Sequence, residues 1–312
     1  SQNKKRTKQQ KATANDMTIA EIEKQIEHEI ASKLNNCGIM YRMFGRAKSM
    51  SSVLHKMEIK GEKYRKGLSR IQDIIGLRFI VYFTDDVDIV EMLVNNNSVV
   101  DRSIDAPDSF TFCPQRLNLV CTIPEYLQEE TRRQLQVEYG EYAQYIDTTF
   151  EVQIRTIFSE GWHEVEHDLR YKCKADWIGY EAQSRTLNGV IATLENAEYS
   201  MLSLFREMAQ SNLMQGNYSA MLRNHLRIRL IGDGLSPEIT EYLKANHEIA
   251  KAVHETERTV LLLSMLYHNH HLTFDYDTIL HLINRMYIQD EGLMQLETTE
   301  QKIEFAHYFK RQ

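Results

Sequence analysis

Residues 150–172 read FEVQIRTIFSEGWHEVEHDLRYK, and this stretch decides the fold. Its first residues alternate between apolar side chains and the polar side chains of Glu151, Gln153 and Arg155, which predicts a strand with one buried face and one polar face. Thr156 follows in a position suited to an N-cap, so we expect a helix to begin where this strand ends. An ordinary antiparallel strand with one face in water shows the same alternation, so other residues must decide whether the polar face is a site.

The composition sets the class of protein. A chain of 312 residues with 42% hydrophobic residues can form one large domain or two modest ones. The net charge of −7 gives no general electrostatic case for binding duplex nucleic acid. The four cysteines show neither metal-ligand spacing nor a dense disulfide pattern, and there is no apolar run of about 18 residues and no signal peptide. We therefore expect a soluble, cytoplasmic protein with no membrane association.

The N-terminal part predicts a tail followed by a helix. Residues 1–16 are polar and basic, which predicts disorder, either as a solubilising tail or as an electrostatic arm for RNA. Thr18 and Glu21 form a capping box, and isoleucines at helical spacing then predict an amphipathic helix to about Leu34.

A group of cations follows the first predicted strand, Ile39–Phe44. Arg46 and Lys48 leave the end of this strand, and Ser52 and Lys56 lie four residues apart on one face of the next predicted helix. Such a strand end, followed by a helix start with cations, can hold phosphates, although the P-loop pattern is absent. Basic side chains at a helix start are also common on solvated surfaces, so this motif alone leaves both interpretations open.

The next segment predicts a loop and then a buried strand. Residues 58–69 are basic, with Lys63 and Arg65, and read as a connection that either closes over polyphosphate or is an ordinary exposed loop. Residues 77–83 are apolar and β-branched, which predicts a buried strand. Asp73 precedes it, and Arg78 interrupts the apolar run, so we expect Arg78 to face a carboxylate or a ligand.

The remaining elements predict a mixed α/β sheet followed by helices. After an expected helix over residues 85–95, the segment 99–123 predicts two strands, at 110–112 and 117–123, and residues 124–136 predict a helix. Beyond Trp177 the pattern is helical throughout. The expected helices are Tyr180–Gln210, Ala220–Leu230, Pro237–Asn246, Ala250–Tyr267, Tyr276–Tyr287 and Glu300–Lys310. A histidine cluster at positions 268, 270 and 271 reads as a surface feature rather than a metal site.

Four motifs occur in order along the chain. They are Gly45-Arg46-x-Lys48-x-x-x-Ser52-x-x-x-Lys56, Asp73-x-x-Gly76-x-Arg78, Glu151-x-Gln153-Ile154-Arg155-Thr156 and Trp162-x-x-x-Glu166-His167-x-x-x-Tyr171-Lys172. Together they resemble the synthetase domain of the RelA/SpoT family, the (p)ppGpp or alarmone synthetases of the stringent response, and the small synthetases in particular. The resemblance implies a synthetase domain at 17–176. With the polar tail at 1–16 and the helical pattern of a C-terminal domain at 177–312, which lies outside the resemblance, we expect three segments.

The resemblance also implies the fold, the reaction and the site. It implies a nucleotidyltransferase-like mixed sheet and transfer of the β,γ-diphosphate of ATP to the 3′-hydroxyl of GDP or GTP, with Mg²⁺ as cofactor. The catalytic and metal-binding residues would be Asp73 and Glu151. The ATP-binding residues would be Arg46, Lys48, Ser52, Lys56 and Arg78, and the acceptor-binding residues would be Gln153, Arg155, His167 and Lys172.

The chain departs from the family pattern on the acceptor side. Pro114 stands where the family has a tyrosine that stacks on guanine, Asn118 replaces a histidine, and Glu160 replaces an asparagine of many small synthetases. Two alternatives therefore stay open: a toxin-like enzyme that modifies adenine nucleotides or the 3′ end of tRNA, and a nucleotide-binding regulator without activity. The helical C-terminal domain either packs and regulates or forms a sensor, antitoxin-like or homo-oligomerisation module.

Overall fold

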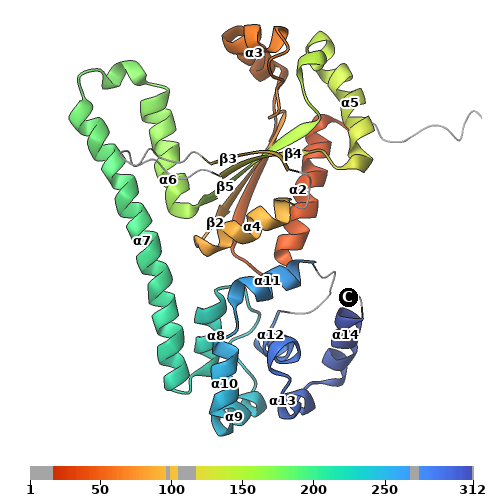
Figure 1. Cartoon of the computed structure of the whole chain (residues 1–312), viewed down its shortest axis with the longest axis vertical. Coiled ribbons are helices and arrows are strands. Elements are labelled where there is room, and N and C mark those ends of the chain that lie inside the picture. The colour runs from red at the N-terminus through yellow and green to blue at the C-terminus, as the bar shows by residue number, and fades with distance from the viewer. Residues whose placement is uncertain (1–16, 96–98, 105–116, 268–273, 311–312) are drawn as a thin grey trace, which may run out of the picture.

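A single mixed β-sheet forms the centre of the N-terminal half. The computed structural model describes residues 17–95, 99–104, 117–267 and 274–310, and shows five strands in the order β1-β2-β5-β4-β3 (Figure 1). The strands are β1 Tyr41–Ala47, β2 Ile75–Val81, β3 Val99–Ile104, β4 Leu117–Thr122 and β5 Thr149–Thr156. Strands β2 and β5 pair in parallel at the centre, and the other neighbours are antiparallel. This confirms the predicted mixed α/β fold with a helical C-terminal region.

The alternation in β5 sets the two faces of the sheet. Phe150, Val152 and Ile154 are buried on one face, whereas Glu151 and Gln153 lie on the other and are only partly buried. The buried face is covered by α2 Ile19–Asn35 and α4 Asp85–Asn95, whose apolar stripes pack on it. The opposite face is available to carry polar groups.

Helix α2 forms as the sequence predicts. Thr18 accepts a hydrogen bond from the backbone N–H of Glu21, and the Glu21 carboxylate accepts one from the backbone N–H of Thr18 in return. The predicted stripe is at most 3% exposed, so the helix is held by burial of one apolar face. Its members are Ile19, Ile22, Ile26, Ile30 and Leu34.

Two predictions on the N-terminal half are corrected. The basic segment 58–69 is not a loop over most of its length, because α3 runs as Met50–Arg65 and buries Met57, Gly61 and Tyr64. The segment consists largely of good helix formers, which explains its continuation as a helix. Strand β3 lies at Val99–Ile104, which was not among the predicted strands. The predicted strand 110–112 lies outside the described residues.

Two helices, α6 and α7, follow β5. Helix α6, Ile157–Glu166, is capped by Thr156 as predicted and continues into one π-helical turn, His167–Tyr171. Of its apolar residues only Trp162 is buried, and Ile157 and Val165 are exposed. After the short 3₁₀ turn Lys174–Trp177, helix α7 runs over Glu181–Met214 and connects α6 to the remaining helices (Figure 1).

The remaining helices pack on one another and, through α11, against α4 and α2, and their buried apolar residues join the same core as those of the sheet. They are α8 Tyr218–Leu226, α9 Pro237–Ala245, α10 His247–His254, α11 Arg258–Tyr267, α12 Tyr276–Ile283 with the π-helical turn Asn284–Ile288, α13 Glu291–Gln295 and α14 Thr299–Phe309. The predicted helix at 250–267 is two helices, and α13 was not predicted. In the N-terminal half, α5 Glu125–Tyr139 and the 3₁₀ helix Gly140–Tyr145 precede β5. Among the described helices, none has both the length and the apolar character that a membrane span requires.

Candidate active site

A cavity of about 460 Å³ lies on the polar face of the sheet. Strands β1, β2 and β5 supply its floor, and α6 supplies carboxylates at its side. Its charged and amide side chains are Arg46, Asp73, Arg78, Glu151, Gln153, Glu160 and Glu164. Both predicted catalytic carboxylates, Asp73 and Glu151, and two predicted ATP-binding residues, Arg46 and Arg78, therefore border one cavity.

The strand register explains how these residues meet. Arg46 of β1 pairs with Gly76 of β2, and Gly76 pairs with Glu151 of β5, so the three lie in one row across the sheet. In the next row, Arg78 pairs with Gln153. A Cβ atom at Gly76 would lie 3.8 Å from Nε of Arg46, an ordinary van der Waals distance, so the Arg46 side chain lies close over β2 at this position.

Asp73 is held by two lysines. Its carboxylate lies 2.9 Å from Nζ of Lys48 and 2.8 Å from Nζ of Lys56. Lys48 follows β1 and donates its backbone N–H to the carbonyl of Ile74, which fixes it beside the start of β2. Partial burial alone would raise the pKa of Asp73, but the hydrogen bonds and charges of Lys56 and Lys48 outweigh it and hold the pKa below its ordinary value.

A second cavity, of about 380 Å³, borders the same lysines along α3. It contains the predicted Ser52, and it adds hydroxyl, imidazole and ammonium groups that the sequence analysis did not single out: Ser51, His55 and Lys60. The spacing of four residues from Ser51 to His55 and from Lys56 to Lys60 is the signal that could have found them, since it places them on the same helical face.

Arg78 faces carboxylates, as the sequence predicts. Its guanidinium lies 2.7 Å from Glu160 and 2.7 Å from Glu164, and Nε donates to the side-chain oxygen of Gln153 at 3.2 Å. Glu160 also pairs with Arg155 at 2.6 Å. Glu160 therefore bridges two arginines from neighbouring strands, and Glu164, one helical turn further on, was missed by the sequence analysis.

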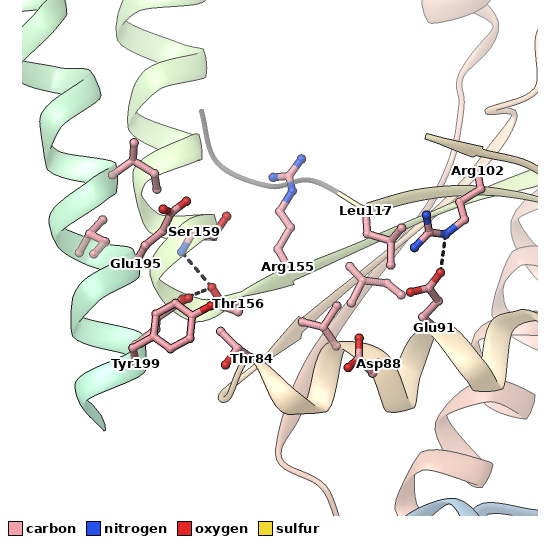
Figure 2. Close-up of a pocket in the computed structure, with 15 residues that line it drawn as sticks. Thr84, Asp88, Glu91, Arg102, Leu117, Arg155, Thr156, Ser159, Glu195 and Tyr199 are labelled. Carbon is pink, nitrogen blue, oxygen red and sulfur yellow. Dashed lines mark hydrogen bonds and ion pairs between the residues drawn. The ribbon is translucent and has the colours of Figure 1, made fainter. Parts of the chain in front are cut away.

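The predicted acceptor residues are not all brought together. Gln153 borders the cavity with Arg78, but Arg155 is only 3% exposed and borders a different cavity, of about 290 Å³, formed with α4 and α7 (Figure 2). His167 and Lys172 both bind the carboxylate of Asp168, at 3.1 Å and 2.7 Å. Neither belongs to the described residues that border the site cavity.

The positions that depart from the family pattern are partly described. Pro114 lies outside the described residues. Asn118 lies on β4 directly opposite Gln153, so it occupies the same row of the sheet as Gln153 and Arg78. Its side-chain oxygen is buried and has no hydrogen-bond partner among the residues that the structure describes.

The chain was compared with known proteins. Residues 45–176 match the family described as "Region found in RelA / SpoT proteins". GTP pyrophosphokinase YjbM of Bacillus subtilis (strain 168) is 32% identical over 131 residues, which cover 41% of this chain and 55% of that relative. The chain thus spans about half the length of this curated relative.

Solved structures give a related result. The crystal structure of small alarmone synthetase 1 from Bacillus subtilis aligns with 61% of this chain and 95% of its own, at 26% identity and a TM-score of 0.42. The same synthetase bound to its product pppGpp aligns with 60% of this chain and 95% of its own, at 23% identity and a TM-score of 0.40. The segment that matches the RelA/SpoT family, residues 45–176, contains all four motifs.

Proposed function

We propose that this chain is an ATP-dependent pyrophosphokinase that transfers the β,γ-diphosphate of ATP to the 3′-hydroxyl of a guanine nucleotide, GDP or GTP, and releases AMP. One observation carries the proposal: Arg46, Asp73, Arg78, Glu151 and Gln153, which belong to separate motifs, border a single cavity. Its volume of about 460 Å³ is in the range of pockets for small ligands. The name of the curated relative, a GTP pyrophosphokinase, supports this choice of reaction.

The donor nucleotide would lie across the two neighbouring cavities. The guanidinium planes of Arg46 and Arg78 can stack on adenine, since arginine binds aromatic faces as well as anions. Lys48, Lys56 and Ser52 border the adjoining cavity on α3, where they would bind the triphosphate. The lysines are partly exposed in their pairs with Asp73, so they can exchange this carboxylate for phosphate oxygens at modest cost.

The carboxylates of Asp73 and Glu151 fit a magnesium ion. Mg²⁺ binds one or two carboxylates together with substrate phosphates and water, and both carboxylates border the cavity. Among the described residues, no group of three or more histidine, cysteine or acidic side chains could hold a metal by itself. We therefore expect Asp73 and Glu151 to hold the ion together with the nucleotide, and the ion would supply charge neutralisation at the phosphates.

The protein would act on the acceptor through Glu151. The acceptor's 3′-oxygen attacks the β-phosphorus of ATP, the bond from this phosphorus to the α-phosphate oxygen breaks, and AMP leaves. The Glu151 carboxylate takes the proton of the attacking hydroxyl. Gln153, one row further along β5, would orient the acceptor.

A second candidate keeps this chemistry and changes the acceptor to an adenine nucleotide or the 3′ end of tRNA. The observations that favour it are on the acceptor side of the site. Asn118 presents an unpaired amide oxygen beside Gln153 among the described residues, and Glu160 is tied to Arg78 and Arg155. A site with different hydrogen-bonding groups rejects the wrong base strongly, because buried groups would stay unpaired.

The test is a product assay. The protein is incubated with ATP labelled in the γ-phosphate and, separately, with GDP, GTP, AMP, ADP or tRNA, and the labelled products are separated. Label on GDP or GTP supports the first candidate, and label on an adenine nucleotide or tRNA supports the second. If no acceptor is labelled and no AMP is released, both are excluded and the chain is a nucleotide-binding regulator or has another activity.

A further inference from the structure

The cavity of the candidate active site is charged at one end and partly apolar at the other. Asp73 borders it before β2 begins, and Arg46 and Glu151 border it near the start of that strand. The apolar side chains of Phe44 and Ile80 border it further along the same strand. A nucleotide is divided in the same way, because it carries charge on its phosphates and a flat aromatic face on its base.

Phe44 lies on β1, the edge strand beside β2, and faces the polar side of the sheet. It pairs with Arg78 in the antiparallel register, and residues directly opposite each other in such a pair project to the same face. The side chains of Phe44 and Arg78 therefore leave the sheet as neighbours. Phe44 is 56% exposed, so much of its ring is free to contact a ligand.

Exposure by itself would not give Phe44 a role, since single apolar side chains are common on protein surfaces. Its place in the fold distinguishes it. Among the exposed large apolar residues in the described part of the chain, only Phe44 borders the cavity on the sheet. A site for a flat ligand presents such aromatic surface before the ligand binds. The ring is therefore placed to form one wall of the ligand site.

The groups around Phe44 favour a nucleobase over an aliphatic ligand. Aromatic side chains bind bases by stacking, and the guanidinium of Arg78 offers a second planar group from the neighbouring strand. Lys48 and Lys56 pair with Asp73 at the charged end, where they would bind phosphates. One nucleoside triphosphate can therefore place its base at Phe44 and its phosphates at the lysines.

We propose that Phe44 determines which base the donor site accepts: its ring contacts the base of ATP and makes the site prefer a purine to a pyrimidine nucleoside triphosphate. A purine presents two fused rings to the phenyl face and a pyrimidine only one, so the purine gains more from the contact. This inference rests on the proposed function, because it assigns the cavity to the donor nucleotide. It adds a specificity-determining side chain that none of the four motifs contains.

Isothermal titration calorimetry with the α,β-methylene analogues of ATP and CTP tests the proposal, since the carbon bridge prevents pyrophosphate transfer during the measurement. The wild type should bind the ATP analogue more tightly than the CTP analogue. Phe44→Ala should weaken binding of the ATP analogue about tenfold, and of the CTP analogue by a smaller factor, with an unchanged Tm. Phe44→Tyr keeps the aromatic ring and should bind both analogues as the wild type does. Ile303→Ala, at an equally exposed residue of α14 outside the cavity, should change neither affinity.

Three results would overturn the proposal: equal affinities of the wild type for the two analogues, an unchanged affinity of Phe44→Ala for the ATP analogue, or an equal loss for both analogues. A weaker affinity of Phe44→Ala for GDP, with the ATP analogue unaffected, would place the ring at the acceptor and also overturn it. The reaction is tested separately by the product assay. If no acceptor is labelled while the expected binding changes are found, the proposed reaction fails and the role of Phe44 in base selection stands.

Discussion

Two clusters of paired charges lie at the two ends of strand β2, and they differ in their access to water. Before the strand, Asp73 pairs with lysines, and its side chain is 21% exposed. After the strand, Asp86 pairs with Arg258, and these side chains are 0% and 5% exposed. Ion pairs of the same kind therefore occur in a partly hydrated cavity at one end of β2 and in the buried contact between α4 and the C-terminal helices at the other.

The difference in hydration indicates a different role for each cluster: substrate binding for the Asp73 cluster and stabilisation of the fold for the Asp86 cluster. Partly hydrated pairs contribute little to stability and can exchange partners, which a substrate site requires. A buried pair has lost its hydration, so removing one member leaves an uncompensated charge. We therefore expect substitutions at the Asp73 cluster to change activity and substitutions at the Asp86 cluster to change stability.

The largest expected effect is on folding. Asp86→Ala leaves Arg258 buried without its carboxylate and should lower the free energy of unfolding by about 3–5 kcal/mol. Asp73→Asn should change it by less than about 1 kcal/mol, because both lysines can reach water. Urea denaturation of the two variants measures both values. Equal losses in the two variants would remove the distinction between the clusters.

The next effect is a pH dependence of the free energy of unfolding, caused by His225, which lies near the contact between α4 and the C-terminal helices. Burial, and next the nearby charges of His254 and then of Arg227 and Arg258, lower the pKa of His225 to about 4, although its hydrogen bond to a backbone carbonyl opposes this. Because the folded pKa lies below the unfolded value of about 6.5, stability is complete above pH of about 6.5 and falls as pH drops toward 4.

The slope for this one histidine approaches about 1.4 kcal/mol per pH unit. Urea denaturation of the wild type and of His225→Gln between pH 7.5 and 5 measures it, and the variant should lose less stability than the wild type over this range. The lowered pKa of Asp73 changes the free energy of unfolding only below a pH of about 4. Parallel pH profiles for wild type and variant would show that His225 is not the group responsible.

A smaller effect is expected at Arg78, which borders the cavity of the candidate active site. Arg78→Lys keeps the charge but removes the planar fork and the stacking surface, so KM for ATP should rise about tenfold. Steady-state kinetics of AMP release measures this, with a thermal melt to verify folding. An unchanged KM would mean that Arg78 serves its carboxylate partners and not the nucleotide.

The smallest effect is expected at Glu164. This carboxylate pairs with Arg78 at 2.7 Å but is 53% exposed, so Glu164→Gln should lower the free energy of unfolding by less than about 0.5 kcal/mol. The change in KM for ATP should stay within about threefold. A loss of stability as large as that of Asp86→Ala would show that exposure is the wrong criterion for separating the two clusters.

The sequence predicted the elements whose signals are local. Alternation in β5 placed Glu151 and Gln153 on one face, the N-cap Thr156 placed α6, and the lone charge in β2 predicted a carboxylate partner for Arg78. These signals are local because strand period, capping and an interrupted apolar run each depend on a few neighbouring residues.

Features that depend on tertiary contacts were not predictable in this way. Acidic residues at a helix start suit the helix dipole and give no sign of a distant partner. Asp85 and Asp86, at the start of α4, nevertheless bind arginines 142 and 172 residues further along the chain. His167 was predicted at the acceptor, yet in the structure it binds Asp168 where α6 widens into a π-helical turn. Strand β3 was missed because its sequence, VVDRSI, lacks a clear alternation.

The central claim is that Asp73 and Glu151 act together in one active site. The most direct measurement is the rate of AMP release from ATP, with each acceptor, for the wild type, Asp73→Asn and Glu151→Gln. The account predicts release by the wild type and a loss of at least about a hundredfold in each variant, with unfolding free energies nearly unchanged. Equal rates in the wild type and both variants would contradict it.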